Sequence, residues 1–138
     1  MIDTTTEFGQ RVTRRLKEER IIWLTTVDRN EVPQPRPVWF WWDGDTFLIY
    51  SKPGTHKLEH IARHPSVALH LDGDGLGGDI VVFTGEAHLA EDAPPANAMA
   101  EYADKYREGF TRINMTPESF AQTYSVPIRV TPTSLRGH

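Results

Sequence analysis

The sequence predicts a mostly β or α+β fold, in which about six strands form an antiparallel sheet or barrel with helices packed outside it. Short polar turns join successive extended runs, as they do in β-hairpins. Apolar and polar residues alternate along several of these runs, which gives each strand one buried face. Only one strand pair is joined by a short helix, whereas a doubly wound parallel sheet needs a helix at each crossover.

The composition is that of one globular domain spanning residues 1–138. With 38% hydrophobic residues and four tryptophans, the 138 residues suffice for a single core. The absence of cysteine excludes thiolate nucleophiles, disulfides and cysteine zinc sites. No apolar run approaches about 18 residues, so we expect no membrane span and a cytoplasmic location. The net charge of −4 predicts no general attraction for nucleic acid.

The N-terminal half is expected to contain one helix and two hairpins. Phe8, Val12 and Leu16 recur at four-residue spacing after threonines that suit an N-cap, which is typical of an amphipathic helix. Gly44 lies in a tight-turn signal between two extended runs and can adopt positive φ there. The expected elements are a helix over residues 6–19 and strands over residues 21–27, 32–42 and 46–50.

The C-terminal half alternates strands with helices. In the longest run, Val81, Phe83, Ala87 and Leu89 are expected on one buried face, and Gly85 marks a possible bend. The expected elements are helices over residues 56–63 and 94–109 and from residue 116, and strands over residues 67–71, 79–91 and 126–131.

Three alternating prolines restrict the position of the second strand. Pro33, Pro35 and Pro37 cannot donate ladder hydrogen bonds, and all three fall on the same side of an extended chain. In a central strand, the three missing hydrogen bonds would destabilise the sheet. That side of the strand is therefore expected to face a sheet edge, a bulge or a ligand.

Four aromatic residues follow these prolines. Alternation places Trp39 and Trp41 opposite Phe40 and Trp42, so one core cannot receive all of them. One pair is expected to meet a second surface. That surface is either a covering helix or partner subunit, or a flat aromatic ligand.

The segment from Tyr50 to Lys57 combines hydroxyl groups, lysines and a helix N-terminus, which suits a phosphate. A capped helix with solvated lysines explains the same residues, and both interpretations stay open. His56, His60 and His64 have helical spacing, but without cysteine or an HExxH pattern they are expected to be surface histidines rather than a metal site. No GxSxG or P-loop motif occurs, neither a nucleoside-triphosphate site nor a Rossmann dinucleotide site is supported, and no catalytic residue is assigned.

The order of these segments resembles the pyridoxamine-phosphate-oxidase-like split β-barrel flavoproteins, especially the small actinobacterial flavin- or deazaflavin-dependent oxidoreductases. The resemblance covers nearly the whole chain and is most specific in the segments EVPQPRPVWFWWDGDTFLIYS and KPGTHKLEHIARHPSVALHL. It implies a six-stranded antiparallel split barrel with flanking helices. It also implies a homodimer with its cofactor clefts at the subunit interface.

The resemblance also implies which residues bind the cofactor. The ring edge would be contacted by Gln34, Arg36, Pro37 and Val38, and the ribityl phosphate by Tyr50, Ser51, Lys52, Thr55, His56 and Lys57. Lys57 is the closest match, whereas Thr55 stands where relatives often carry an arginine. The implied cofactor is coenzyme F420, with FMN as the alternative.

The implied activity is hydride transfer from reduced cofactor to a small unsaturated or quinone-like substrate. Such a cofactor carries the redox chemistry itself, which agrees with a chain that has no triad and no thiol. Because no catalytic acid or base can be assigned, a non-catalytic carrier or sensor of flavin-type molecules is a further hypothesis. The number of histidines also suggests a haem-binding split barrel.

Overall fold

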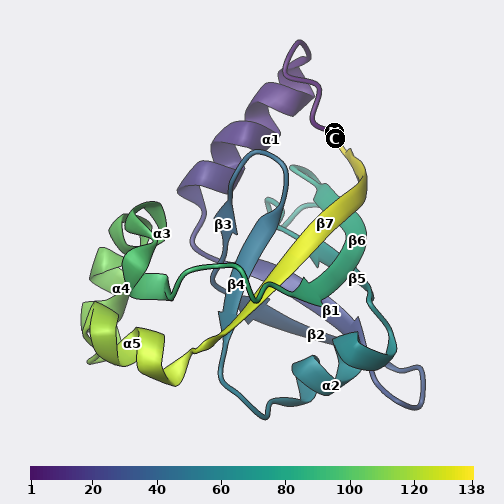
Figure 1. Cartoon of the computed structure of the whole chain (residues 1–138). Helices are drawn as coiled ribbons and strands as arrows, with labels where there is room; N and C mark the ends of the chain where they lie inside the picture. The colour runs from purple at the N-terminus through teal and green to yellow at the C-terminus, as the bar shows by residue number, and fades with distance from the viewer.

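A computed structural model describes all residues, 1–138, and its centre is one antiparallel sheet of seven strands. The sheet curls into a half-barrel, and its strand order is β2-β1-β5-β6-β7-β4-β3 (Figure 1). The strands are β1 (Ile22–Val27), β2 (Pro33–Val38), β3 (Trp41–Trp42), β4 (Phe47–Ser51), β5 (Ser66–His70), β6 (Val81–Leu89) and β7 (Val126–Gly137). The predicted class, an antiparallel split barrel with flanking helices, is confirmed, but the sheet has seven strands where six were expected.

Helices lie in three places around the barrel (Figure 1). Helix α1 packs beside β3, α2 connects β4 to β5, and the remaining helices form a separate group between β6 and β7. The helices are α1 (Glu7–Glu18), α2 (His56–Arg63), the 3₁₀ turn η1 (Ala96–Ala98), α3 (Ala100–Lys105), α4 (Arg107–Arg112) and α5 (Pro117–Thr123). None of these helices has the length and the apolar character that crossing a membrane requires.

Local capping explains where two of these helices begin. The Thr6 hydroxyl accepts a hydrogen bond from the Gly9 amide at 3.0 Å and so starts α1. Helix α5 begins with a capping box in which Thr116 and Ser119 bond each other's backbone amides. Both start sites are where the sequence predicts them.

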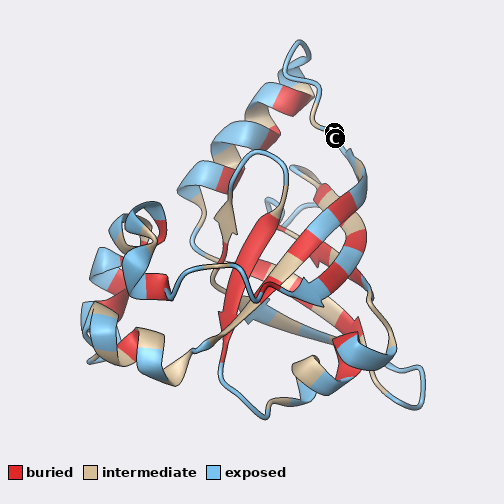
Figure 2. Cartoon of the chain, in the orientation of Figure 1, coloured by how far each residue is buried: buried red, intermediate tan, exposed pale blue.

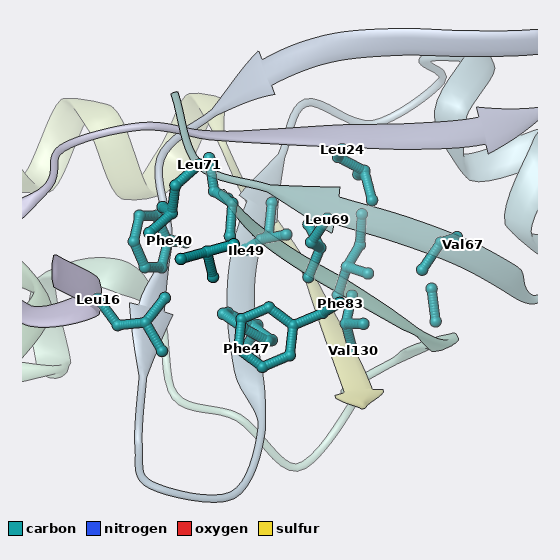
Figure 3. Packing of buried hydrophobic residues seen from close by; sticks show 14 of the residues in the cluster. Leu16, Leu24, Phe40, Phe47, Ile49, Val67, Leu69, Leu71, Phe83 and Val130 are labelled. Atoms are coloured by element: carbon teal, nitrogen blue, oxygen red, sulfur yellow. The ribbon is translucent and has the colours of Figure 1, made fainter. Parts of the chain in front are cut away.

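The first hydrophobic core fills the barrel. Phe47 and Phe83 meet edge to face at a centroid distance of 5.0 Å, and α1 adds Val12 and Leu16 from outside the sheet. Figure 2 shows β4 buried along its length and buried positions alternating with exposed ones along β7, and Figure 3 shows buried side chains packed together between the strands. This core holds β1, β4 and α2 in fixed relative positions, and these elements carry the candidate site.

The second core is aromatic and joins the helical group α3–α5 to the barrel. Trp39 stacks on Tyr106 at 4.4 Å and on Phe120 at 5.3 Å, while Phe40 is buried in the first core. The predicted split of the aromatic run between two surfaces is therefore confirmed. Trp39 and Trp41 pack against the cluster that the helices of the same chain contribute, as one of the two alternatives requires.

The predicted strand over residues 32–42 is two strands on opposite edges of the sheet. Strand β2 pairs only with β1, and β3 pairs only with β4. Between them the Phe40 amide donates to the Tyr106 hydroxyl at 2.8 Å instead of joining a ladder. The chain thus crosses the open side of the barrel here. The edge position of β2 confirms the prediction from its prolines.

Other expectations need smaller corrections. The helix expected over residues 94–109 is a 3₁₀ turn and two short helices, because the chain bends between them at Met99 and Tyr106. Leu89 is 53% exposed rather than buried, since it lies at the end of β6 beyond the core. Strand β7 extends to Gly137, because β6 supplies a pairing partner along that whole length.

Substituting Gly85 by alanine is expected to destabilise the protein by about 1 to 3 kcal/mol. The register of β6 against β7 shifts between Thr84 and Gly85, and a Cβ at position 85 would lie 2.5 Å from the Thr131 carbonyl oxygen. That oxygen belongs to the backbone and cannot move aside freely. Urea unfolding measures the loss. Gly78→Ala is the control, because there the atoms nearest to the new Cβ belong to the Asp74 side chain and not to the backbone; equal losses of stability would contradict the prediction.

Candidate functional site

Two adjoining pockets lie where β2 faces the turn between β4 and α2. The first, of about 700 Å³, has no hydrophobic residue in its lining; we call it the charged pocket. The second, of about 300 Å³, is mostly hydrophobic; we call it the aromatic pocket. Arg36 and Lys57 line both. The charged pocket also includes Asp28, Gln34, Thr55, His60 and Arg63, and the aromatic pocket also includes Trp39, Tyr50, Tyr102, Ile113, Phe120 and Tyr124.

Arg36 and Lys57 are half-buried cations without a partner. Neither side chain takes part in any of the five ion pairs of the chain. Burial lowers the pKa of both groups, and the charges of Arg36 and Lys52 lower the pKa of Lys57 further. Lys57 therefore holds its proton less tightly in the free protein than an exposed lysine would. An anion bound between the two side chains would offset this effect.

The turn that precedes Lys57 is held by the hydroxyl groups of Ser51, which is buried, and Thr55, which is half-buried. The Ser51 side chain is 1% exposed, donates to the Lys52 carbonyl at 2.9 Å and lies 3.0 Å from the Thr55 hydroxyl. Gly54 has φ of +73°, which disfavours other residues. Because Thr55 bonds Ser51, its side chain does not cap α2. The first amides of α2 are thus left without a side-chain acceptor.

Asp28 is already engaged inside the charged pocket. Its carboxylate accepts from the amides of Asn30 and Val32 at 2.9 and 3.0 Å and from the Gln34 side chain at 3.1 Å. The Val32 hydrogen bond contributes most to lowering the pKa of Asp28. The carboxylate therefore shapes the β1–β2 turn and orients Gln34, and it forms no ion pair with Arg36.

The structure brings most of the predicted cofactor residues together. The charged pocket contains Gln34, Arg36, Thr55, His56 and Lys57, and the aromatic pocket contains Arg36, Pro37, Val38, Tyr50 and Lys57. Ser51 lies buried behind the turn instead of lining a pocket. Lys52 is exposed, and its ammonium lies 5.5 Å from the centre of the Tyr124 ring.

His60 corrects one expectation from the sequence. It is 8% exposed, and its Nδ1 lies 2.8 Å from the hydroxyl of Thr26, which is also buried. The expected surface position is thus wrong for His60, although His56 is exposed. Because α2 packs against β1, one of two histidines on a single helical face is buried and the other is not. Helical spacing alone does not separate them.

The aromatic pocket is the part of the site that the sequence did not reveal. Trp39, Tyr102, Phe120 and Tyr124 come from segments far apart in the chain and meet only when α5 packs on Trp39. The spacing of Tyr102 and Tyr106 indicates a buried helical stripe. It carries no information about which strand the stripe will cover.

Lowering the pH is expected to destabilise the protein through His60. Burial, and then the charge of Arg36, lower the pKa of His60 below its ordinary value of 6.5, against the opposing charges of Asp28 and Glu59. Unfolded His60 therefore binds a proton more readily than folded His60, and the free energy of unfolding falls as pH drops through 6.5.

Urea unfolding at about pH 7.5 and about pH 5.5 measures this fall in stability. The variant His60→Asn is expected to show a shallower fall than the unsubstituted protein. The control is His88→Asn at an exposed position of β6. If both variants retain the full pH dependence, His60 does not cause it.

The half-barrel and its paired pockets define a split-barrel protein in which a cation-rich pocket adjoins an aromatic one. The sequence matches the family described as pyridoxamine 5'-phosphate oxidase over residues 8–137. The chain therefore belongs to this family, which confirms the resemblance at the level of the family. No curated protein matches the sequence.

Solved structures of low sequence identity share the fold. A putative pyridoxamine 5'-phosphate oxidase from Listeria innocua has a TM-score of 0.68 at 23% identity, covering 92% of this chain and 94% of the other. A protein described as an F420 reductase has a TM-score of 0.65 at 22% identity, with 89% and 94% covered. The heme storage protein HutZ from Vibrio cholerae has a TM-score of 0.66 at 13% identity, with 96% and 95% covered.

Proposed function

We propose that this protein is an oxidoreductase that binds a phosphorylated flavin-type cofactor, coenzyme F420 in preference to FMN. It would transfer a hydride between that cofactor and a small unsaturated or quinone-like substrate. The observation that carries the proposal is the pair of half-buried, unpaired cations, Arg36 and Lys57, that line both the charged and the aromatic pocket. A cofactor with a phosphate and a planar ring needs both environments side by side.

The residues present fit such a cofactor. Arg36 and Lys57 would neutralise the phosphate, with Thr55 and His56 at the start of α2 beside them. Gln34, Pro37 and Val38 of β2, together with Tyr50, would border the ring. Ser51 would act indirectly, because its hydrogen bonds hold the turn. Lys52 would add positive charge near the site.

The size and charge of the charged pocket favour F420 over FMN. Beyond Arg36 and Lys57 the pocket contains Arg29 and Arg63, whereas its carboxylates are Asp28 and Glu59. FMN has one phosphate and no further acid group, while F420 carries carboxylates in addition to its phosphate. A polar pocket of about 700 Å³ with an excess of cations suits the more extended anion.

Bound cofactor would supply the hydride chemistry, and the protein would supply binding and orientation. Trp39, Phe120 and Tyr124 present apolar surface on one side of the aromatic pocket and would limit access of water to the ring. Arg36 and Lys57 would fix the anionic end, so that the ring takes one position. No side chain of this site is assigned as a proton donor.

We also propose that the protein is a homodimer with the cofactor site beside the subunit interface. Strand β2 is an edge strand next to both pockets, and no other strand of the chain pairs with its outer side. A partner subunit covering this side would complete the walls of the site. Light scattering on purified protein tests the proposal, which requires a mass of twice 15.7 kDa.

Parallel titration of cofactor-free protein with FMN and with F420, followed by cofactor fluorescence, tests the proposed function. We expect tighter binding of F420, and then turnover of reduced F420 with a panel of quinones and unsaturated compounds. Tighter binding of FMN would assign the protein to the flavin branch of the family. Binding without turnover by any acceptor would indicate a carrier or sensor, and binding of neither cofactor would overturn the proposal.

A further inference from the structure

The imidazole of His60 is fixed by a buried hydrogen bond at one of its two nitrogens. His60 lies on α2 and is 8% exposed, and its Nδ1 lies 2.8 Å from the hydroxyl of Thr26, which is 0% exposed on β1. A hydroxyl can donate to a bare ring nitrogen or accept from a protonated one. Thr26 therefore satisfies Nδ1 whether the imidazole is neutral or charged, and it fixes the direction of the ring.

The second nitrogen, Nε2, is open to the charged pocket. It makes no hydrogen bond within the chain, because the only side-chain bond of His60 is the one to Thr26. Nor is it one of the buried side-chain polar atoms without a partner, which are Nε of Arg11 and the hydroxyl of Tyr102. Nε2 is thus accessible and points away from Thr26. His60 lines the charged pocket and not the aromatic one, so a ligand in the charged pocket can reach this atom.

The groups around His60 keep its ring neutral in the free protein. Burial lowers its pKa, and the charge of Arg36 on β2 and that of His56 on the same helix lower it further. The carboxylates of Asp28 and Glu59 oppose this effect without reversing it. At about pH 7 the imidazole of the free protein is therefore mostly uncharged.

An anion in the charged pocket would change this balance. The pocket also contains Arg29, Lys57 and Arg63, so its cations outnumber its carboxylates. Strands β1 and β6, against which α2 packs, add no titratable group on their buried faces. An anionic oxygen beside Nε2 would offset the repulsion from Arg36 and favour the protonated imidazole. The protonated ring could then donate a charge-assisted hydrogen bond to that oxygen.

We propose that His60 is a proton-coupled anion-binding residue: its Nε2 donates to a phosphate or carboxylate oxygen of the cofactor, and the imidazole takes up one proton from solvent as the anion binds. The inference rests on the proposed function and deepens it, since it adds a titrating contact to the cations Arg36 and Lys57. The complex then holds one proton more than the free protein and the free cofactor. Cofactor affinity therefore rises as pH falls through the range in which His60 titrates.

The test compares dissociation constants of F420 and of FMN at about pH 8 and about pH 6 for the unsubstituted protein and for His60→Asn. Asparagine keeps a polar group beside Thr26 but cannot take up a proton. We expect the gain in affinity at the lower pH to be about tenfold larger for the unsubstituted protein. Titration of the cofactor itself affects both proteins alike, so the difference between them belongs to His60. An effect with FMN assigns the contact to the phosphate, and an effect with F420 alone assigns it to a carboxylate.

The matched control is His56→Asn, because His56 is an exposed histidine on the same helix and in the same pocket. This variant is expected to keep the pH dependence of the unsubstituted protein, whatever its affinity at a single pH. Riboflavin, which has the ring of FMN without its phosphate, is expected to show the same pH profile with the unsubstituted protein and with His60→Asn. A pH dependence that disappears in His56→Asn and persists in His60→Asn would overturn the role of His60.

A second measurement needs no substitution. NMR of the ¹⁵N-labelled histidine rings gives the pKa of each imidazole in the free and in the cofactor-saturated protein. We expect the pKa of His60 to rise on binding and that of His88, an exposed residue of β6, to stay the same. An unchanged or lowered pKa of His60 in the complex would overturn the inference and leave the proposed function in place. If the protein binds neither F420 nor FMN, the proposed function is overturned and this inference fails with it.

Discussion

Replacing Lys57 by alanine is expected to weaken the binding of F420 and of FMN by about 1 to 3 kcal/mol, a roughly 5- to 150-fold loss of affinity. Lys57 lines both pockets and has no ion-pair partner within the chain. Its half-buried ammonium is screened less by solvent than a surface charge would be. An anion beside it therefore gains more than it would from an exposed lysine.

The same substitution is expected to maintain or raise the stability of the free protein. Burial is the main cause that lowers the pKa of Lys57 below 10.5, followed by repulsion from Arg36 and Lys52. A lysine with a lowered folded-state pKa destabilises the fold at neutral pH, and this penalty disappears as pH rises through 10.5. Lys57→Ala removes the penalty. Loss of affinity combined with no loss of stability distinguishes a binding residue from a structural one.

Fluorescence titration and thermal unfolding measure the two effects on the same samples. Lys17→Ala is the control, because Lys17 is an exposed lysine on α1 that lines neither pocket. It is expected to alter neither affinity nor melting temperature. An unchanged dissociation constant for Lys57→Ala would show that the phosphate is bound elsewhere. A large drop in melting temperature would assign Lys57 to the structural framework.

Trp39→Ala is expected to destabilise the protein by about 3 kcal/mol and to abolish ring binding. Trp39 is the residue of the barrel on which the helical group packs, through Tyr106 at 4.4 Å and Phe120 at 5.3 Å. It also faces Gly109, where an added Cβ would lie 2.9 Å from the indole ring. Removal of the indole would thus leave a cavity under α4 and α5 and take away one wall of the aromatic pocket.

Urea unfolding followed by far-UV circular dichroism measures the loss, and riboflavin titration reports on the ring site. Trp23→Ala is the matched control. Trp23 stacks on His70 at 6.2 Å and donates to Asp72 at 3.0 Å, and it belongs to neither core cluster. We expect Trp23→Ala to lower the free energy of unfolding by about 1 kcal/mol. Equal destabilisation by the two substitutions would mean that Trp39 does not anchor the helical group.

The family assignment and the choice of ligand rest on different observations. The family assignment rests on residues 8–137 and is independent of the site geometry. Solved structures with the same fold include proteins described as an F420 reductase and as a heme storage protein, at 22% and 13% identity. At such identities the shared fold does not select a ligand. The charges and hydroxyl groups of this chain carry the proposal instead.

Features that depend on neighbouring residues were determined by the sequence alone. Gly44 and its polar neighbours specify the β3–β4 turn, and the prolines of β2 specify an edge strand, because backbone dihedrals and missing donors act locally. The segment from Tyr50 to Lys57 likewise predicts a strand, a turn and a helix start. Each of these elements is present in the structure.

Features that depend on distant residues were decided by the tertiary structure. The strand expected over residues 32–42 is interrupted because Phe40 bonds Tyr106, 66 positions away. Burial of His60 depends on the packing of α2 against β1, and the aromatic pocket depends on the packing of α5 against Trp39. Periodicity predicts which face of a helix is apolar, but not the surface that covers it. The unsatisfied hydroxyl of Tyr102 belongs to this second group, because a buried polar atom can be identified as unpaired only once the positions of all surrounding residues are known.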